Sequence, residues 1–410
     1  VNFEIDGLIS LYNKMKDDFE RGYMVESIWK FLIYTEIAKS IYDELKNKPT
    51  YAKNDDEEKF IEFVESHTGI ILTDFSTRLE QQIQELIKID EQNQSTFKIR
   101  ISEILHDNII LELKNHIVKN IHKNGKIVVL IDNLDKSWRK DSNVIILSKF
   151  ILGLLGVVGR IAKDFRVHKC NNYKFTFHLT IFLRSDIFKY IMNTAREPDK
   201  IEYTRLSWND KEILFRIIES RFEELTMLNV TASELWLKYI DERTNGINTK
   251  DYIINNIFPR PRDLIYYLSS SKNLAVSRGH SKITEDDLIS AHKDYSNWVF
   301  KSLIVENGIT IKQMEDFMYN LMGENQILSD ESIQLIAIKS NINVDSKDSL
   351  ESFIDHLVSL SILGREVKDS EFEYEYEFDT NLKLKALSSK METKRFKIHN
   401  ALKTYLELTN

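Results

Sequence analysis

The chain has 410 residues, enough for two or three domains that each bury a real core. Hydrophobic residues make up 42% and aromatic residues 11%, with only 12 Gly and 4 Pro, which excludes a disordered protein and predicts an α-rich α/β fold. The net charge of −8 excludes a general attraction to nucleic acid or anionic membranes. Cys170 is the single cysteine, so cysteine-rich zinc sites and intramolecular disulfides are excluded and a cytoplasmic location is expected.

The N-terminal part of the chain predicts helices that precede a buried strand. VNFEI at 1–5 alternates as a strand would, and 27–45 follows with a helical pattern. A polar loop is expected at 46–59, and helical patterns then resume up to the turn HKNGK. IVVLID at 127–132 reads as the buried strand after that turn.

Three further apolar segments predict βαβ units. VIILSKFILGLLGVVG at 144–159 is shorter than the about 20 residues that cross a bilayer and contains Lys149, so we expect a buried helix packed on a sheet. FTFHLTIFLRSDIF at 175–188 predicts an interior strand, and IEYTRLSW at 201–208 predicts a third, short strand. Strands that alternate with helices indicate a parallel sheet covered on both faces.

The C-terminal half has two different patterns. The first is helical and includes RPRDLIYYL at 260–268, which opens a helix after a proline-rich break. In the second, helices at 331–340 and 348–363 precede a polar and aromatic hairpin at 365–379 and a Lys-rich final helix, the order of a winged helix-turn-helix. We therefore expect three domains, which are a core at 1–208, a helical lid at 209–305, and a winged-helix-like domain with a terminal helix at 306–410.

The strand IVVLID ends in two carboxylates three residues apart. Open parallel sheets place ligands at the carboxyl ends of their strands, so Asp132 is expected to face a ligand crevice. Mg²⁺ is held by one or two carboxylates together with phosphate oxygens and waters, which suits Asp132 as a metal ligand. Asp135 is close enough in sequence to polarise an attacking water. The alternative is structural, with Asp135 as a helix cap and Asp132 paired with a lysine.

Two later segments offer arginines for a phosphate. FLRSD places Arg184 at the end of the next interior strand, where it could sense a γ-phosphate or simply pair with Asp135. RPRDLI places Arg260 and Arg262 at a helix start, and guanidinium groups suit bidentate phosphate contacts. Both arginines could equally be surface charges beside Asp263.

IVVLIDNLD, FLRSD and RPRDLI, in that order before a winged-helix-like region, resemble the Walker B, sensor 1 and sensor 2 segments of AAA+-related P-loop ATPases. The closest resemblance is to the bacterial group that borders the STAND and KAP NTPases, whose members often lie in defence loci. The resemblance implies an ATP and Mg²⁺ site with Asp132 as the metal carboxylate and Asp135 as the water-activating acid. Arg184 would lie in the sensor 1 segment, and Arg262 would be the sensor 2 arginine beside Arg260.

The sequence departs from this family because it contains no GxxxxGK[ST] phosphate-binding loop. The only GK pair, Gly125 and Lys126, lies directly before the Walker B strand. One explanation is that the loop and its strand are encoded before Val1, where a strand, loop and helix would add about 30 residues. The other is a degenerate NTPase fold kept for interaction. We favour the first, because both carboxylates are retained and a lost central strand would expose backbone edges.

The winged-helix-like region is poorly suited to DNA. Its expected recognition helix is nearly free of Lys and Arg, and its hairpin is rich in Glu, so phosphate contacts would be repelled. Nucleic acid or an acidic partner could instead meet the basic final segment, although a solvated charged face is the simpler reading. The cations of that segment are Lys383, Lys385, Lys390, Lys394, Arg395, Lys397 and Lys403.

The sequence therefore supports two main functional hypotheses. The first is an ATP-binding and hydrolysing switch or motor ATPase that forms a homo-oligomer or controls an effector protein, in bacterial antiphage defence by analogy with the family. The second is a catalytically inactive NTPase-fold scaffold or DNA-associated regulator. A metal-dependent nuclease is disfavoured, because no PD-(D/E)xK-like arrangement accompanies the carboxylates, and no membrane partner is expected.

Overall fold

The computed structural model divides the chain into two compact units, unit 1 (Val1–Tyr203) and unit 2 (Thr204–Asn410). The described residues are 5–14, 16, 22–89, 109–121, 126–134, 144–166, 176–195, 197–201, 203–204, 206–226, 231–307, 313–377, 381–391 and 394–409. Within them the chain is mostly helical, with small parallel and antiparallel sheets. The helical domain predicted in the C-terminal half is confirmed, whereas a complete P-loop core is not seen among these residues.

Unit 1 is built around the long helix α3 (Tyr23–Lys46). Over residues 24–38 its side chains are buried or half-buried on all sides, among them Trp29, Leu32 and Tyr34, as expected for a helix inside a helical layer. The helix contacts α4, α5, α6, α8 and α9. The helices of this unit are α1 (Ile5–Lys14), α3, α4 (Asp55–Ser66), α5 (Thr68–Ile71), α6 (Phe75–Ile89), α8 (Ile109–Asn120), α9 (Val144–Arg166) and α10 (Ser185–Thr194), with short 3₁₀ turns at Thr50–Ala52 and Pro198–Lys200.

Helix α9 lies directly against α3. A Cβ atom added at Gly153 would lie 2.5 Å from Cγ1 of Val25, so the absence of a side chain there allows the two backbones to approach. One turn earlier, the Trp29 indole donates a hydrogen bond to the Phe150 carbonyl at 2.8 Å, and the two rings lie 4.7 Å apart. The predicted helix at 144–159 is therefore confirmed, and it extends to Arg166.

One stretch of α9 is also long and apolar enough to cross a membrane. The segment Val144–Ile161 has a mean hydropathy of 2.1, and half of it is buried within the protein. Its buried side chains, including Leu147, Phe150, Ile151 and Leu154, belong to the core of unit 1.

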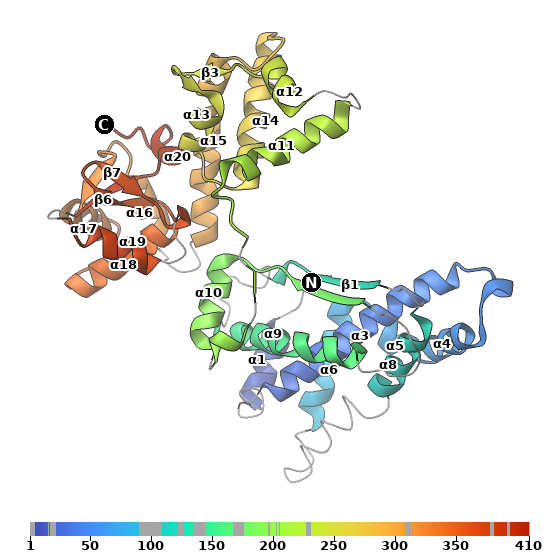
Figure 1. The fold of residues 1–410 in the computed structure, drawn as a ribbon. Coiled ribbons are helices and arrows are strands. Elements are labelled where there is room, and N and C mark those ends of the chain that lie inside the picture. The colour runs from blue at the N-terminus through green and yellow to red at the C-terminus, as the bar shows by residue number, and fades with distance from the viewer. Residues whose placement is uncertain are drawn as a thin grey trace. The chain divides into compact units, whose positions relative to one another are not determined.

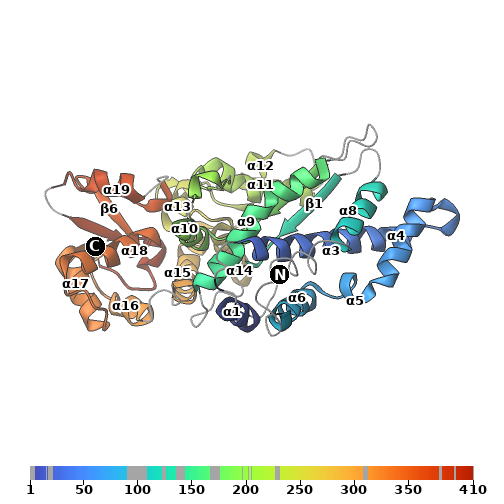
Figure 2. The same ribbon diagram turned by 90° about the horizontal axis from the view of Figure 1, so that it is seen from below.

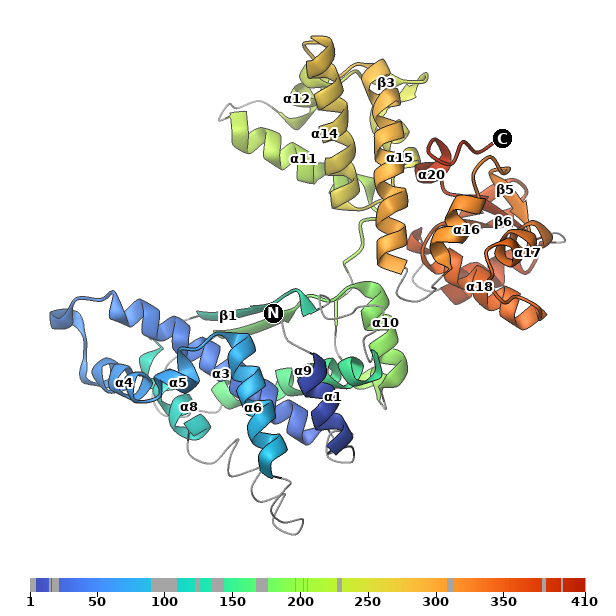
Figure 3. The same cartoon turned by 180° about the vertical axis from the view of Figure 1, so that it is seen from behind.

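The sheet of unit 1 consists, among the described residues, of two parallel strands, β1 (Lys126–Ile131) and β2 (Thr176–Ile181), in the register Ile131 to Ile181. The predicted strands at 127–132 and 175–188 are thus present but end earlier. Figures 1 and 3 show helices α3 and α9 on one side of these strands. Side chains on the opposite face are exposed, with Val128 at 48% and Leu130 at 63%.

The first part of unit 2 is a helical array. Helices α14 and α15 share the most extensive contact among the described helices and run side by side, joined by a short turn at the left-handed Gly279 (Figure 3). A small hairpin of β3 (Arg243–Thr244) and β4 (Ile247–Asn248) lies beside α15. The helices are α11 (Lys211–Thr226), α12 (Ala232–Tyr239), α13 (Thr249–Asn256), α14 (Pro261–Arg278) and α15 (Glu285–Asn307).

The rest of unit 2 packs helices on an antiparallel sheet with strand order β5-β8-β6-β7. Helices α18 and α19 both contact β6 (Figure 2). The predicted sequence of two helices followed by a hairpin is present as α17, α18 and the β6–β7 pair. The elements are α16 (Met314–Asn320), β5 (Ile327–Ser329), α17 (Asp330–Lys339), α18 (Lys347–Ser359), β6 (Leu363–Lys368), β7 (Glu371–Glu373), a 3₁₀ turn (Glu375–Glu377), α19 (Asn381–Ser388), β8 (Arg395–Ile398) and α20 (Asn400–Lys403).

Two predicted elements differ from the structure. The described residues of IEYTRLSW form no strand, and Tyr203 and Leu206 are 62% and 70% exposed, because no neighbouring strand pairs with them. The Lys-rich final helix is divided into α19, β8 and α20, because RFKI alternates and buries Phe396 and Ile398 on one face. The predicted strand VNFEI lies outside the described residues except for Ile5, which begins α1.

Candidate functional site

The carboxyl ends of β1 and β2 bring two of the predicted site residues to one edge of the sheet. The Phe182 amide donates to the Ile131 carbonyl at 2.9 Å, which continues the parallel ladder just past both strands. Asp132 follows β1 directly, and Arg184 lies two residues beyond that last hydrogen bond. The placement of Asp132 and Arg184 at the same sheet edge therefore agrees with the parallel pairing predicted from the sequence.

A tight backbone turn holds Asp132 at this edge. Asn133 has a φ of 63°, in the left-handed region that asparagine tolerates, and its amide donates to Oδ1 of Asp132 at 2.8 Å. Leu134 then turns into the core and is 1% exposed. The Asp132 side chain is exposed, so its carboxylate can bind a cation without the cost of a buried charge.

Arg184 occupies the position before the first residue of α10. Its carbonyl accepts the Phe188 amide at 2.9 Å, and its side chain is half-buried. Asp135, the predicted water-activating acid, lies outside the described residues, and the same holds for the Asp186 side chain. The structure therefore places Asp132 and Arg184 but not the second carboxylate.

The other two predicted arginines lie in unit 2, at the start of α14. Arg260 is at the N-cap position of this helix without a side-chain capping hydrogen bond, and its guanidinium carbon lies 5.0 Å from the centre of the Phe258 ring. Arg262 is exposed on the first turn. Pro261 at the first helical position removes an amide that would have no partner there. The start of an 18-residue helix favours anions, so these arginines can present their charge to a phosphate.

A buried hydrogen-bond chain fixes the break before α14. The Phe258 amide donates to the Tyr295 hydroxyl at 2.9 Å, and that hydroxyl donates to Oδ1 of Asp263 at 2.8 Å. Asp263 is 2% exposed and Tyr295 is fully buried. Burial and the nearby Asp263 carboxylate raise the pKa of Tyr295 well above its ordinary value, so the hydroxyl stays protonated and donates.

His399 packs on the same break from the C-terminal end of the chain. Its ring stacks on Phe258 with the centres 4.4 Å apart. Its Nδ1 accepts the Ala401 amide at 3.0 Å, so the proton of the neutral ring is on Nε2, which lies 3.1 Å from the Tyr376 hydroxyl. Burial lowers the pKa of His399 to about 3, with a smaller effect from the positive charge of Arg260.

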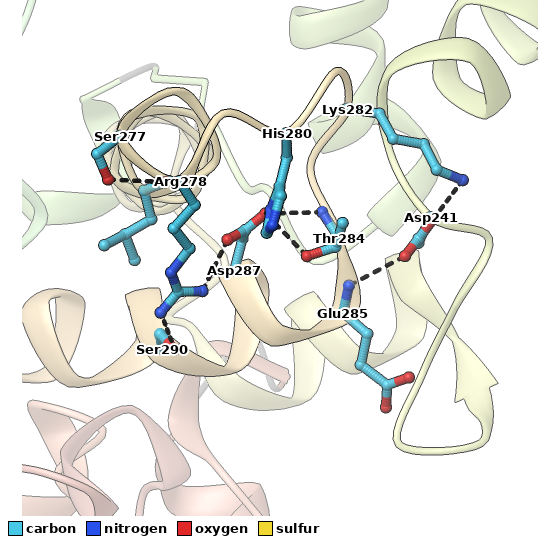
Figure 4. A network of polar contacts seen from close by, with 10 residues as sticks. Asp241, Ser277, Arg278, His280, Lys282, Thr284, Glu285, Asp287 and Ser290 are labelled. Carbon is cyan, nitrogen blue, oxygen red and sulfur yellow. Dashed lines mark hydrogen bonds and ion pairs between the residues drawn. The ribbon is translucent and has the colours of Figure 1, made fainter.

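A second buried carboxylate joins α14 to α15 (Figure 4). Asp287 accepts hydrogen bonds from Arg278 at 2.7 Å, from His280 at 2.8 Å, and from the amide and hydroxyl of Thr284 at 3.0 and 2.8 Å. Burial acts to raise the pKa of Asp287, but these donors outweigh it and hold that pKa well below its usual range. Asp241 supports the same turn by accepting the Glu285 amide at 3.1 Å. This network ties the end of α14 and the turn after it to the first turn of α15.

Metal and polyanion binding receive limited support from the described residues. They contain no group of three or more His, Cys, Asp or Glu side chains that could hold a metal ion. The predicted basic stretch is also divided. Lys385 pairs with Glu351 and Asp355 at 2.7 and 2.8 Å, and Arg395 pairs with Glu366.

Comparison with known proteins assigns one part of unit 2. Residues 212–304 match the family described as the FunZ-associated C-terminal helical domain. This range corresponds closely to the helices α11 to α15. No curated protein and no solved structure matches the chain.

Several residues that organise unit 2 were missed by sequence reasoning. Thr284 and Asp287 form the spacing of a helix capping box, so the sequence TEDD before an apolar run could have identified them. Asp263 gave no such signal, because its partner Tyr295 is 32 residues away in the sequence. His399 contacts Phe258, which lies more than 100 residues earlier in the chain. A single sequence contains no pattern that predicts this contact.

Proposed function

We propose that this chain is part of an ATP-dependent switch or motor ATPase whose nucleotide site lies at the carboxyl edge of β1 and β2. One observation supports the proposal above the others. The parallel register puts Asp132 and Arg184, the predicted Walker B carboxylate and sensor 1 arginine, at the same edge. This is the edge where open α/β sheets bind ligands.

Each residue has a definite chemical role in this proposal. The exposed Asp132 carboxylate would hold Mg²⁺, which would supply positive charge to the phosphates, and Asp135 would orient the attacking water. Arg184 would sense the γ-phosphate at this edge. In unit 2, Arg260 and Arg262 offer guanidinium groups suited to bidentate contact with a phosphate. The setting in antiphage defence, with an effector or a homo-oligomeric partner, rests on the family resemblance alone.

The test measures ATP binding and hydrolysis by the protein as its own gene encodes it, because the 410 residues contain no GxxxxGK[ST] cradle. Asp135→Asn is expected to keep Mg²⁺-dependent ATP binding and to lose turnover by about a hundredfold or more. Asp132→Asn is expected to lose Mg²⁺-dependent binding as well. Asp199→Asn, an exposed carboxylate on a 3₁₀ turn of unit 1, is the matched control. Normal hydrolysis by Asp135→Asn would contradict the catalytic assignment.

A second function, a non-catalytic scaffold, is favoured by the exposed face of the β1–β2 sheet. Parallel strands are normally covered on both faces, yet Leu130 and Phe182 are 63% and 45% exposed. A scaffold would show no nucleotide-induced thermal shift in the protein as encoded, whereas the ATPase would show one that requires Mg²⁺.

A further inference from the structure

The connection between α13 and α14 is held by side chains from distant segments of unit 2. The Asn400 side-chain amide donates to the Asn255 carbonyl at 2.8 Å, and Nε2 of His292 lies 3.1 Å from the Asn256 carbonyl. The C-terminal helix α20, which begins at Asn400, lies against both α13 and α15 (Figures 1 and 3). The C-terminal segment and α15 therefore set the course of the chain just before Arg260.

One aromatic contact continues this support to Phe258. Its ring stacks on His399 with the centres 4.4 Å apart and the planes inclined by 27°, and the two residues are only 1% and 3% exposed. His399 is itself fixed on the C-terminal module, because its amide donates to the Ile362 carbonyl at 3.0 Å and its Nε2 lies 3.1 Å from the Tyr376 hydroxyl. The Phe258 ring is thus buried and held in place by a residue of that module.

Arg260 lies over this ring and remains exposed. Its guanidinium carbon is 5.0 Å from the centre of the Phe258 ring, a distance at which a cation is attracted to an aromatic face. His399 is neutral, because its Nδ1 accepts the Ala401 amide, so it adds no positive charge beside the guanidinium. A long side chain that is held in one orientation loses less conformational freedom when it binds a ligand.

We propose that His399 is a positioning residue for Arg260. Through the Phe258 ring it holds the guanidinium in the orientation that meets a phosphate, and it thereby links the C-terminal module to that contact. His399 does not touch the ligand itself. The identity of the ligand, the phosphates of ATP, rests on the proposed function.

The first experiment follows Arg260 itself, by NMR of the protein labelled with ¹⁵N-arginine. The Nε–H signal of Arg260, identified by its loss in Arg260→Lys, is expected to be shifted by the Phe258 ring. His399→Gln keeps a polar group but removes the stacked ring, so the signal should move towards that of a free arginine. His399→Phe keeps a stacked ring but loses the hydrogen bonds of the imidazole, so the signal should stay near its wild-type position.

A merely structural role, carried by the hydrogen bonds of His399, would give the opposite order for these two variants and would overturn the proposal. Phe258→Leu removes the ring on which Arg260 lies, and it is expected to shift the Arg260 signal as His399→Gln does. It decides the question if a histidine variant does not fold. An unchanged signal in Phe258→Leu would show that this ring does not orient Arg260.

The second experiment is a double-mutant cycle with Arg260→Gln, measured as kcat/KM for ATP hydrolysis by the protein as its own gene encodes it. His399→Gln is expected to lower kcat/KM by about two- to fivefold when Arg260 is present and to have no effect in Arg260→Gln. His356→Gln, which changes a half-buried histidine on α18, is the matched control and should have no effect in either background.

The outcomes separate this proposal from the proposed function. Equal losses with and without Arg260 would overturn the positioning role, because His399 would then act on the fold and not through Arg260. A wild-type protein that hydrolyses no ATP would contradict the proposed function, whereas the NMR signal of Arg260 would still decide whether His399 positions it.

Discussion

The two sheets of the molecule differ in how their faces are covered. In unit 1, the parallel strands leave Val128, Leu130 and Phe182 between 45% and 63% exposed. In unit 2, the antiparallel sheet buries Leu363, Phe396 and Ile398 to 1% exposure or less. Unit 2 thus closes its sheet with its own helices, whereas unit 1 covers one face and leaves the other accessible. The accessible face adjoins the edge that holds Asp132.

The two units also differ in what joins their elements. In unit 1, the close packing of α9 on α3 at Gly153 is accompanied by polar contacts between elements, such as the Trp29 indole with the Phe150 carbonyl and the buried Arg78 with Glu36. In unit 2, the polar contacts between elements include groups whose pKa values are strongly shifted, namely Tyr295 with Asp263, Asp287 with Arg278, and His399 with Tyr376. Mutations that alter volume should therefore test unit 1 most sharply, and changes of charge or pH should test unit 2.

The largest expected effect comes from Asp287→Ala. Removing this carboxylate leaves Arg278, His280 and Thr284 without their shared acceptor, and we expect a loss of about 3 kcal/mol in the free energy of unfolding. Hydrogen exchange should show faster opening of α14 and α15, with α3 and α9 unchanged. Because the folded-state pKa of Asp287 is lowered, its contribution is complete above the unfolded pKa of about 4 and is lost on further acidification.

Asp286→Ala is the matched control for this variant, since it removes a neighbouring but exposed carboxylate from the same helical turn. It should change the unfolding free energy by less than about 0.5 kcal/mol. Equal losses for the two variants would mean that the buried network does not hold α14 to α15, and the contrast between the units would fail.

A smaller effect is expected in unit 1 from Gly153→Ala. The new methyl group would lie within 2.5 Å of Val25, so α3 and α9 must separate, at a cost of about 2 kcal/mol. Gly159→Ala is the control, because it is on the same helix with no atom within 4 Å of the added Cβ, and alanine should stabilise the helix there by up to about 1 kcal/mol. Denaturant unfolding distinguishes the two. A stabilising Gly153→Ala would contradict close packing of α3 on α9.

The elements that were predicted correctly from the sequence are those with a signal in their own residues. The apolar runs of β1, β2 and α9 and the capped start of α14 are local signals, and each was identified from its own residues. The third strand at 201–208 was wrongly predicted, because a strand needs a neighbour that the sequence does not identify. Strand β8 was hidden in a Lys-rich segment, since its two buried residues are too few to show a period.

Part of the candidate site was also predicted from local signals, and part was not. Asp132 and Arg184 were predicted because each ends an apolar strand, and parallel pairing alone brings them together. The groups around Arg260 were not predicted. They come from α15 and from the C-terminal end of the chain, and such contacts between distant segments depend on tertiary packing.

The smallest expected effect, a change in pH dependence, tests whether His399 links the C-terminal end to the break before α14. Its folded pKa is about 3, below the unfolded value of about 6.5. Between these values the unfolded chain binds a proton that the folded chain does not, so stability falls as pH decreases, by at most about 1.4 kcal/mol per pH unit. His399→Gln should remove this part of the slope between about pH 6 and pH 5, where Asp287 is still ionised. His178→Gln, at an exposed position on β2, should leave the slope unchanged. If His399→Gln keeps the full slope, the histidine is protonated in the folded protein, and the packing of His399 on Phe258 must then accommodate a charge.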